Sequence, residues 1–246
     1  MDARTITLWL AEAERKIKAQ ADHLSALDAA LGDGDHGTNM SRGFDAVGKA
    51  LADQEQALPP GQLLILAGKT LISTIGGASG ALWGLALRRA GRSLGDTEHF
   101  DGPALAGALD AMVDAVVELG EASPGDKTML DALMPGAAAL REALDAGEPI
   151  AQAVAAAADA ARAGADATAQ MQARKGRARS WPNDRSGIRI RAPTPRRSCS
   201  PPWSMPSPGS AERLLTAPRG MGVTGRNPDY RGRGSYLALW VLTFSL

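Results

Sequence analysis

The sequence predicts an all-α fold, a closed barrel or bundle of antiparallel amphipathic helices. Two observations lead to this class. Over residues 1–178, apolar side chains recur at spacings of three and four, which is the period of a helix with one buried face. The same residues are rich in Ala, Leu and Glu, and they contain no convincing alternating stretch of β-branched side chains from which a sheet could form.

The predicted helices follow one another along the chain and are separated by turn residues. The first covers residues 5–31, whose apolar stripe comprises Ile6, Leu10, Ala13, Ile17, Ala21 and Leu24. The second carries the stripe Met40, Phe44, Val47 and Leu51. Five more are predicted near residues 61–74, 79–92, 103–119, 128–145 and 149–172. Turn residues stand between them at Pro59-Pro60, Gly76-Gly77, Pro124-Gly125, Gly147 and Pro149. The sequence therefore predicts seven helices, packed as a bundle.

The formal net charge of zero hides two unlike parts. Residues 1–178 carry 16 basic and 24 acidic side chains, whereas residues 179–246 carry 11 arginines, no lysine, 3 acidic residues and 9 of the 15 prolines. We therefore expect a helical domain over 1–178 and a disordered Arg- and Pro-rich tail over 179–246. Such a tail is compatible with RNA binding. The lack of lysine instead favours GC-rich DNA translated in a frame that was never selected to encode protein.

Targeting and redox features are few. The single cysteine, Cys199, excludes an intrachain disulfide, and the N-terminus lacks the continuous apolar stretch of a secretory signal. The longest apolar run near the end of the chain, LALWVLTFSL, is too short to cross a bilayer as a helix. We expect a cytoplasmic protein without a membrane partner.

A cluster of aspartates carries the first chemical signal. The segment LDAALGDGDHGTNMSRGF places Asp28, Asp33 and Asp35 within eight residues, and interspersed glycines let the backbone turn tightly. Asp28 continues the apolar stripe of the first helix, where a carboxylate is costly unless it is paired or metal-bound. Clustered carboxylate oxygens suit Mg²⁺ or Ca²⁺. A calcium EF-hand does not fit, because Gly37 and Thr38 replace required residues. Helix-capping or solvated aspartates are the alternative.

Two further segments fit the binding of phosphate, which often accompanies Mg²⁺. GGASGALWG, from Gly76 to Gly84, opens a helix whose first amides are free to meet an anion. SPGDKTML, from Ser123 to Leu130, forms a turn before another helix. Taken singly, each is equally compatible with a packing or capping device. No Walker A, protein-kinase or Rossmann pattern occurs, so a nucleotide site here has another design.

Together these segments resemble one family. LDAALGDGDHGTNMSRGF, TLISTIGGASGALWG, PGDKTMLDAL and MQARKGRA are similar, in order and spacing, to the nucleotide-binding subunit L of bacterial dihydroxyacetone kinase. That subunit is equivalent to the C-terminal domain of the single-chain kinases. The resemblance covers residues 1–178 and implies a closed barrel of eight antiparallel helices. Seven are predicted here, and the eighth is expected to be lost.

The resemblance also implies a set of site residues. Asp28, Asp33 and Asp35 would hold two Mg²⁺ ions that bridge the phosphates of ADP or ATP. The nucleotide would be contacted by His36, Gly37, Thr38, Asn39, Ala78, Ser79, Gly120, Met129 and Arg177. His36 alone, beside a glycine turn, is more typical of a residue that orients its neighbours through a hydrogen bond than of a base.

The activity implied is transfer of the γ-phosphate to dihydroxyacetone held on a partner, subunit K. A phosphotransferase-system partner, subunit M, would rephosphorylate the bound ADP. The short chain, which starts directly at the first helix, favours the separate subunit, expected as a homodimer. Three alternatives stay open: a regulatory module that signals ADP state to a transcription activator, a non-functional truncated subunit, and erythrulose as the acceptor.

The resemblance stops after KGRA. The family continues roughly as YLGERS-GH-DPGA and an apolar helix, whereas this chain reads RSWPNDRSGIRIRAP. We assigned GC-biased codons to this stretch and shifted the reading frame one base earlier after codon 180. The translation then reads LAERSIGHPDPGADSA and, further on, ALLLAALVDA. We therefore hypothesise that residues 179–246 are a frameshift product. Without a final helix one apolar face stays open, so we expect this chain to be unstable or to bind ADP poorly.

Overall fold

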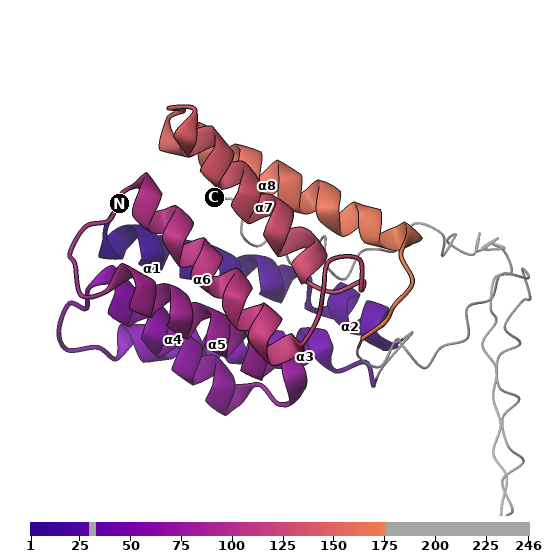
Figure 1. The fold of residues 1–246 in the computed structure, drawn as a ribbon. Helices are drawn as coiled ribbons and strands as arrows, with labels where there is room; N and C mark the ends of the chain where they lie inside the picture. Colours follow the sequence, from indigo (N-terminus) through magenta and orange to yellow (C-terminus); the bar gives the residue numbers. More distant parts are fainter. Residues whose placement is uncertain (30–32, 176–246) are drawn as a thin grey trace, which may run out of the picture. The chain divides into compact units, whose positions relative to one another are not determined.

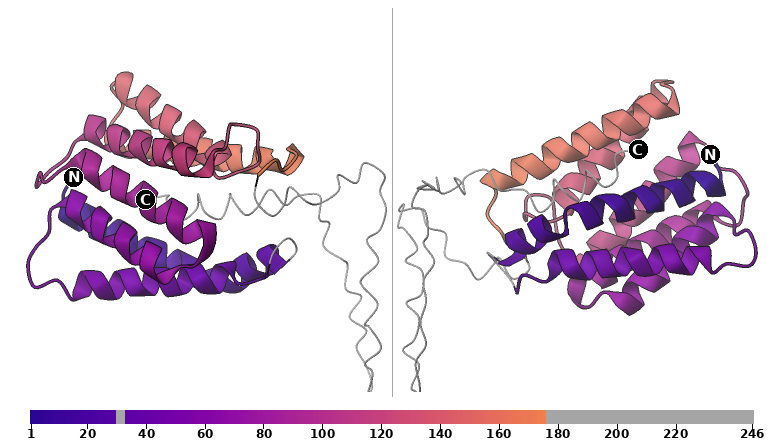
Figure 2. Two further views of the ribbon diagram at one scale, coloured as in Figure 1. Left: turned by 60° about the horizontal axis from the view of Figure 1, so that its bottom comes forward. Right: turned by 180° about the vertical axis from the view of Figure 1, so that it is seen from behind.

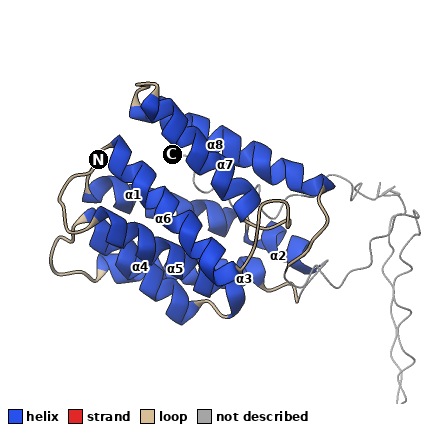
Figure 3. Cartoon of the chain, viewed as in Figure 1, coloured by secondary structure: helices blue, strands red, loops and turns tan. Residues whose placement is uncertain are grey.

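The computed structural model describes residues 1–29 and 33–175, and within these ranges the chain forms eight α-helices and no β-strand (Figures 1 and 3). The all-α prediction is confirmed. The helices are α1 (Ala3–Ala19), α2 (Ala21–Ala29), α3 (His36–Ala52), α4 (Pro60–Thr74), α5 (Gly77–Leu94), α6 (Gly102–Gly120), α7 (Leu130–Asp145) and α8 (Ile150–Ala167), followed by a 3₁₀ turn at Thr168–Gln170. The expectations for the tail and for Arg177 lie outside the described residues.

The prediction of one helix over residues 5–31 is wrong. The helix ends at Ala19, and α2 begins after Gln20. Ile17 and Leu24 are both buried, so the apolar stripe continues across the break and gives no sign of it. Just after the break α3 approaches closely, since a Cβ on Gly37 would lie 1.8 Å from the carbonyl oxygen of Ala21. This break explains why the described residues contain eight helices rather than seven.

The helices pack in sequence order around a common core. Each helix from α3 to α8 packs against the next one, and α1 packs against α3 and α4 (Figures 1 and 2). The core is built from the predicted apolar stripes, with Leu10, Met40, Leu71, Leu87 and Leu130 almost fully buried. Because neighbouring helices run antiparallel, the starts of α3, α5 and α7 lie at the same end of the bundle as the ends of α2, α4 and α6. That end contains the candidate site.

Helix α8 is the least enclosed of the eight described helices. It packs extensively against α7 only, and its buried residues are Ala153 and Ala165. The helix pairs with extensive contact do not include α1 and α8. Within the described part of the chain, the ring of helices is therefore open between its first and last members.

Candidate functional site

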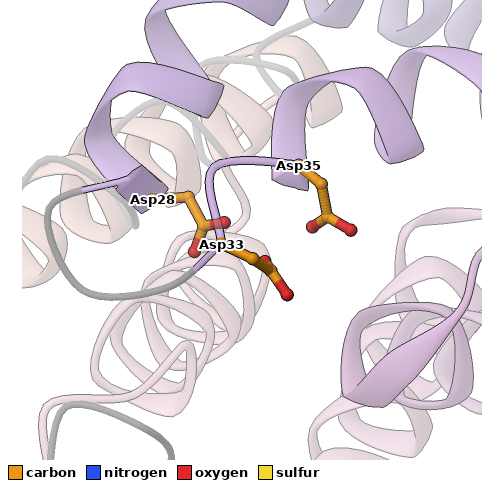
Figure 4. Close-up of side chains that lie close together, drawn as sticks. All are labelled: Asp28, Asp33 and Asp35. Carbon is orange, nitrogen blue, oxygen red and sulfur yellow. The ribbon is translucent and has the colours of Figure 1, made fainter. Parts of the chain in front are cut away.

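The three aspartates of the sequence cluster converge at one end of the bundle. Asp28 lies near the end of α2, Asp33 lies in the following turn, and Asp35 is the N-cap residue of α3 (Figure 4). Each offers a carboxylate oxygen, and the three oxygens lie within 4.8 Å of one another. Gly34 has a φ of +76°, and its backbone N–H donates a 2.9 Å hydrogen bond to Asp28 Oδ2. The glycine turn therefore folds the aspartates together, as its spacing suggests.

This cluster fits a divalent cation. Asp33 and Asp35 are exposed and Asp28 is half-buried, and each contributes one carboxylate oxygen to the cluster. Three negative charges at such distances repel one another. An oxygen-preferring ion such as Mg²⁺ would offset that repulsion and keep open coordination positions for phosphate oxygens.

Two helix starts beside the cluster supply groups that attract anions. Neither the N-cap residue of α3, Asp35, nor that of α5, Gly76, makes a side-chain capping hydrogen bond. In α3 the Thr38 N–H donates to the Ser25 Oγ, so the first turn of α5 is the better source of amide donors, and the helix dipole adds partial positive charge at both starts. Gly77 has a φ of +72°, and a Cβ on Gly80 would lie 2.2 Å from the Ile75 carbonyl oxygen. The α5 turn is thus tight enough to require glycine.

His36 connects these two helix starts. Its Nδ1 lies 3.5 Å from the Oγ of Ser79, so the first turn of α3 meets the first turn of α5. Burial lowers the pKa of the imidazole, while the charges of Asp28 and Asp35 act in the opposite direction. The neutral form is therefore favoured. This geometry suits a side chain that orients its neighbours.

Residues 37–39, which complete the first turn of α3, are held by contacts to α2 and by hydrogen bonds. Gly37 is buried against α2, and the backbone N–H of Thr38 donates to the Ser25 Oγ at 3.3 Å. The Asn39 Oδ1 accepts from the Arg42 guanidinium at 2.8 Å, and the same guanidinium nitrogen donates to the carbonyl of Thr74 in α4 at 3.3 Å. The predicted residues 36–39 thus form one fixed turn beside the aspartates. Ala78, exposed, and Ser79, half-buried, lie on the first turn of α5.

The predicted residues Gly120 and Met129 flank a loop organised by two buried carboxylates. Asp126 accepts from the Ser123 N–H at 2.9 Å. Asp131 accepts from the N–H groups of Gly125 and Thr128. Gly120 is the last residue of α6, and Met129 is the N-cap residue of α7 and packs against the core.

Asp131 is not among the site residues predicted from the sequence. A recognisable signal was present, because Thr128 and Asp131 have the spacing of a helix capping box.

Arg177 lies two residues past the last described position. The segment that leads to it is attached to the same loop, since the Arg174 backbone N–H donates to the Asp126 carbonyl at 3.1 Å. The Arg174 guanidinium also lies 4.0 Å from the Asp126 carboxylate. The predicted contact between Arg177 and phosphate stays a prediction.

The chain belongs to the family of the DAK2 domain, whose model matches residues 30–188. The ADP-binding subunit DhaL of the PEP-dependent dihydroxyacetone kinase of Escherichia coli K12 is 36% identical, over 74% of this chain and 85% of that protein. The L-erythrulose 1-kinase of Mycolicibacterium smegmatis is 40% identical, over 72% of this chain. The chain spans only 31% of the length of that kinase.

A solved structure supports the same assignment. The dihydroxyacetone kinase of C. freundii in complex with AMP-PNP and Mg²⁺ matches with a TM-score of 0.54 and 30% identity. The match covers 69% of this chain and 29% of that one. No helix in the described ranges is both long enough and apolar enough to cross a membrane.

Proposed function

We propose that this chain is the nucleotide-binding component of a dihydroxyacetone kinase. It carries Mg-ADP or Mg-ATP and passes the γ-phosphate to dihydroxyacetone held on a partner subunit. The observation that carries this proposal is the convergence of Asp28, Asp33 and Asp35 within 4.8 Å, beside the starts of α3 and α5, whose own N-cap residues make no side-chain capping bond. A relative named as an ADP-binding subunit and a similar kinase solved with AMP-PNP and Mg²⁺ support it.

Some of the site residues would hold cations and phosphate charge, and others would contact the nucleotide. Asp28, Asp33 and Asp35 would hold two Mg²⁺ ions, which when bound neutralise phosphate charge and fix the γ-phosphate for attack. The Gly34 amide keeps the Asp28 carboxylate in place. The first amides of α5 and the dipoles of both α3 and α5 would meet the remaining phosphate charge. The nucleotide itself would be contacted by His36, Gly37, Thr38, Asn39, Ala78, Ser79, Gly120, Met129 and Arg177.

The chain's own contribution is positioning rather than proton transfer. Phosphoryl transfer requires an aligned, charge-compensated phosphate more than covalent help from the protein. Burial lowers the pKa of His36, and the side chain contacts Ser79, which suits orientation of the two helix starts. We therefore assign the acceptor and any base that activates it to the partner, subunit K. A phosphotransferase-system partner, subunit M, would restore ATP from the bound ADP.

Erythrulose is the second candidate acceptor. It is favoured by the similarity to kinases named for L-erythrulose in two bacteria, at 40% and 38% identity. Because the choice of acceptor would lie with the partner, the nucleotide site described above serves either sugar.

Reconstitution tests the proposal. The full chain is mixed with a dihydroxyacetone-binding subunit and supplied either with ATP or with subunit M and phosphoenolpyruvate, and phosphorylated product is measured for dihydroxyacetone and erythrulose. We expect turnover that is lost in Asp35→Asn and kept in Asp22→Asn, an exposed aspartate at the start of α2. Turnover that survives Asp35→Asn would refute the role of the cluster. Mg-ADP binding without turnover, under conditions in which a known L subunit is active, would favour the regulatory module.

A further inference from the structure

The loop between α6 and α7 contains a lysine in a backbone conformation that favours glycine. Lys127 has a φ of +61°, in the left-handed region, where the Cβ of an L-residue crowds the following carbonyl oxygen. Gly125, two residues earlier, has a φ of +87° without such crowding. Strained positions of this kind concentrate at ligand sites, where the surrounding structure holds them in place. The presence of lysine rather than glycine at position 127 therefore indicates a role for its side chain.

Two buried carboxylates hold the backbone on both sides of Lys127. Asp131 accepts hydrogen bonds from the Gly125 N–H and, at 2.8 Å, from the Thr128 N–H. Asp126 accepts from a third amide of the same loop at 2.9 Å. Because both carboxylates are buried, water competes little for these bonds. The conformation at position 127 is thus fixed by bonds that do not involve the lysine side chain.

The ammonium of Lys127 does not pair with these carboxylates. In the part of the chain that the structure describes, the cation beside the Asp126 carboxylate is Arg174, at 4.0 Å, and Lys127 takes part in no ion pair. Lys127 is half-buried, so water and salt screen its charge less than that of a fully exposed lysine. A partly screened cation in a fixed loop is suited to bind an anionic ligand.

The loop lies at the end of the bundle that contains the aspartate cluster. It connects the end of α6 to the start of α7, and these lie at the same end as the end of α2 and the start of α3 (Figures 1 and 2). We propose that the Lys127 ammonium contacts the phosphates of the bound nucleotide, an inference that rests on the proposed function. The three carboxylates of the cluster and the phosphates together carry more negative charge than two Mg²⁺ ions offset. A further cation at this end would therefore stabilise the complex.

Calorimetric titration of the full chain with Mg-ADP tests the contact. Lys127→Met removes the charge and keeps a long unbranched side chain, whereas Lys127→Arg keeps the charge. We expect the affinity to fall about tenfold or more in Lys127→Met and to be largely kept in Lys127→Arg. Lys69→Met is the matched control, because Lys69 is an exposed lysine of α4, and it should bind like the native chain. Native affinity in Lys127→Met, or equal losses in the Met and Arg variants at position 127, would overturn the proposal.

Glycine at position 127 separates the charge of the side chain from the conformation of the loop. Lys127→Gly removes the charge and also relieves the left-handed strain, so its Tm should exceed that of Lys127→Met. We expect the two variants to bind Mg-ADP equally weakly. If Lys127→Gly instead regains native affinity, the residue acts through the conformation of the loop, and the contact with phosphate is wrong.

Two comparisons separate this inference from the proposed function. If the native chain binds Mg-ADP, Asp35→Asn does not, and Lys127→Met binds like the native chain, only the Lys127 contact fails. If the folded native chain does not bind Mg-ADP, the proposed function fails and the contact fails with it. A Lys127→Met variant that keeps its affinity but loses turnover in the reconstituted kinase would overturn the contact with phosphate in favour of a contact with the partner subunit.

Discussion

Asparagine at position 35 separates the metal-binding role of the aspartate cluster from its effect on folding. Asp35→Asn removes one charge and keeps the shape of the side chain. At separations up to 4.8 Å, each carboxylate pair repels by about 1 kcal/mol in water, and physiological salt roughly halves that value. Loss of two pairs therefore stabilises the metal-free protein by about 1 kcal/mol. Loss of negative charge at the start of α3 costs about 0.3–1 kcal/mol. The two effects nearly cancel.

The effect of Asp35→Asn on the stabilisation by bound Mg-ADP has no such opposing contribution. A ligand at ten times its dissociation constant raises the free energy of unfolding by about 1.4 kcal/mol. In a domain of this size that corresponds to an increase in Tm of roughly 3–6 °C. We expect the native chain to show this increase with Mg-ADP, and Asp35→Asn to lose most of it.

Thermal unfolding in EDTA, in Mg²⁺, in ADP and in Mg-ADP measures both quantities. Asp22→Asn is the control, because Asp22 also stands in the first turn of a helix but lies outside the cluster. We expect it to keep the full ligand-induced shift. The reasoning is wrong if Asp35→Asn keeps that shift, or if it lowers Tm equally with and without Mg-ADP, because the second result would indicate a structural role alone.

Three further predictions follow from particular contacts and from the DNA. Gly37→Ala should destabilise the fold by about 1–3 kcal/mol, because the new Cβ would lie 1.8 Å from the Ala21 carbonyl oxygen; it should also weaken Mg-ADP binding, and an unchanged denaturation midpoint would count against the close packing of α2 and α3. Asp131→Asn should cost about 1–3 kcal/mol by weakening the acceptors of the Gly125 and Thr128 amides; hydrogen exchange should be faster in residues 123–128, and unaltered protection there would refute this role. The minus-one frame after codon 180 should encode GHPDPG, and sequencing that yields any other reading ends the frameshift hypothesis.

The helices could be predicted because their apolar spacing is local. Buried residues such as Leu10, Met40 and Phe44 all fall on the predicted stripes. The break at Gln20 could not be predicted, since no glycine or proline marks it and the stripe runs through it. The close approach of Gly37 to the Ala21 backbone beside the break is a tertiary contact, which the local sequence does not reveal.

In the candidate site, too, local features could be predicted from the sequence and contacts between distant residues could not. The aspartates were visible because they lie within eight residues and are separated by glycines, which makes convergence a local property. His36 and Ser79 are 43 positions apart in the sequence and lie on two different helices, so their contact could be found only in the folded structure. For Asp131 only the spacing from Thr128 is local. Its hydrogen bonds to the Gly125 and Thr128 amides depend on the folded loop.

The core of the described residues bears on the expected stability. The sequence predicts a chain that is unstable or binds ADP poorly, because the family's final helix is expected to be lost. The described residues nevertheless share one buried apolar cluster that joins α1, α3, α4, α5, α6 and α7. We therefore expect the native chain to unfold in one cooperative transition, and a broad, non-cooperative transition would favour the expectation from the sequence.

Nucleotide binding through cations held by Asp28, Asp33 and Asp35 can be measured in one experiment. The full chain is titrated with ADP in a calorimeter, first in Mg²⁺ and then in EDTA. We predict saturable binding of one nucleotide per chain in Mg²⁺, its loss in EDTA, and its return when Mg²⁺ is restored. Equal affinity in EDTA, or no binding by a folded chain in Mg²⁺, would contradict it.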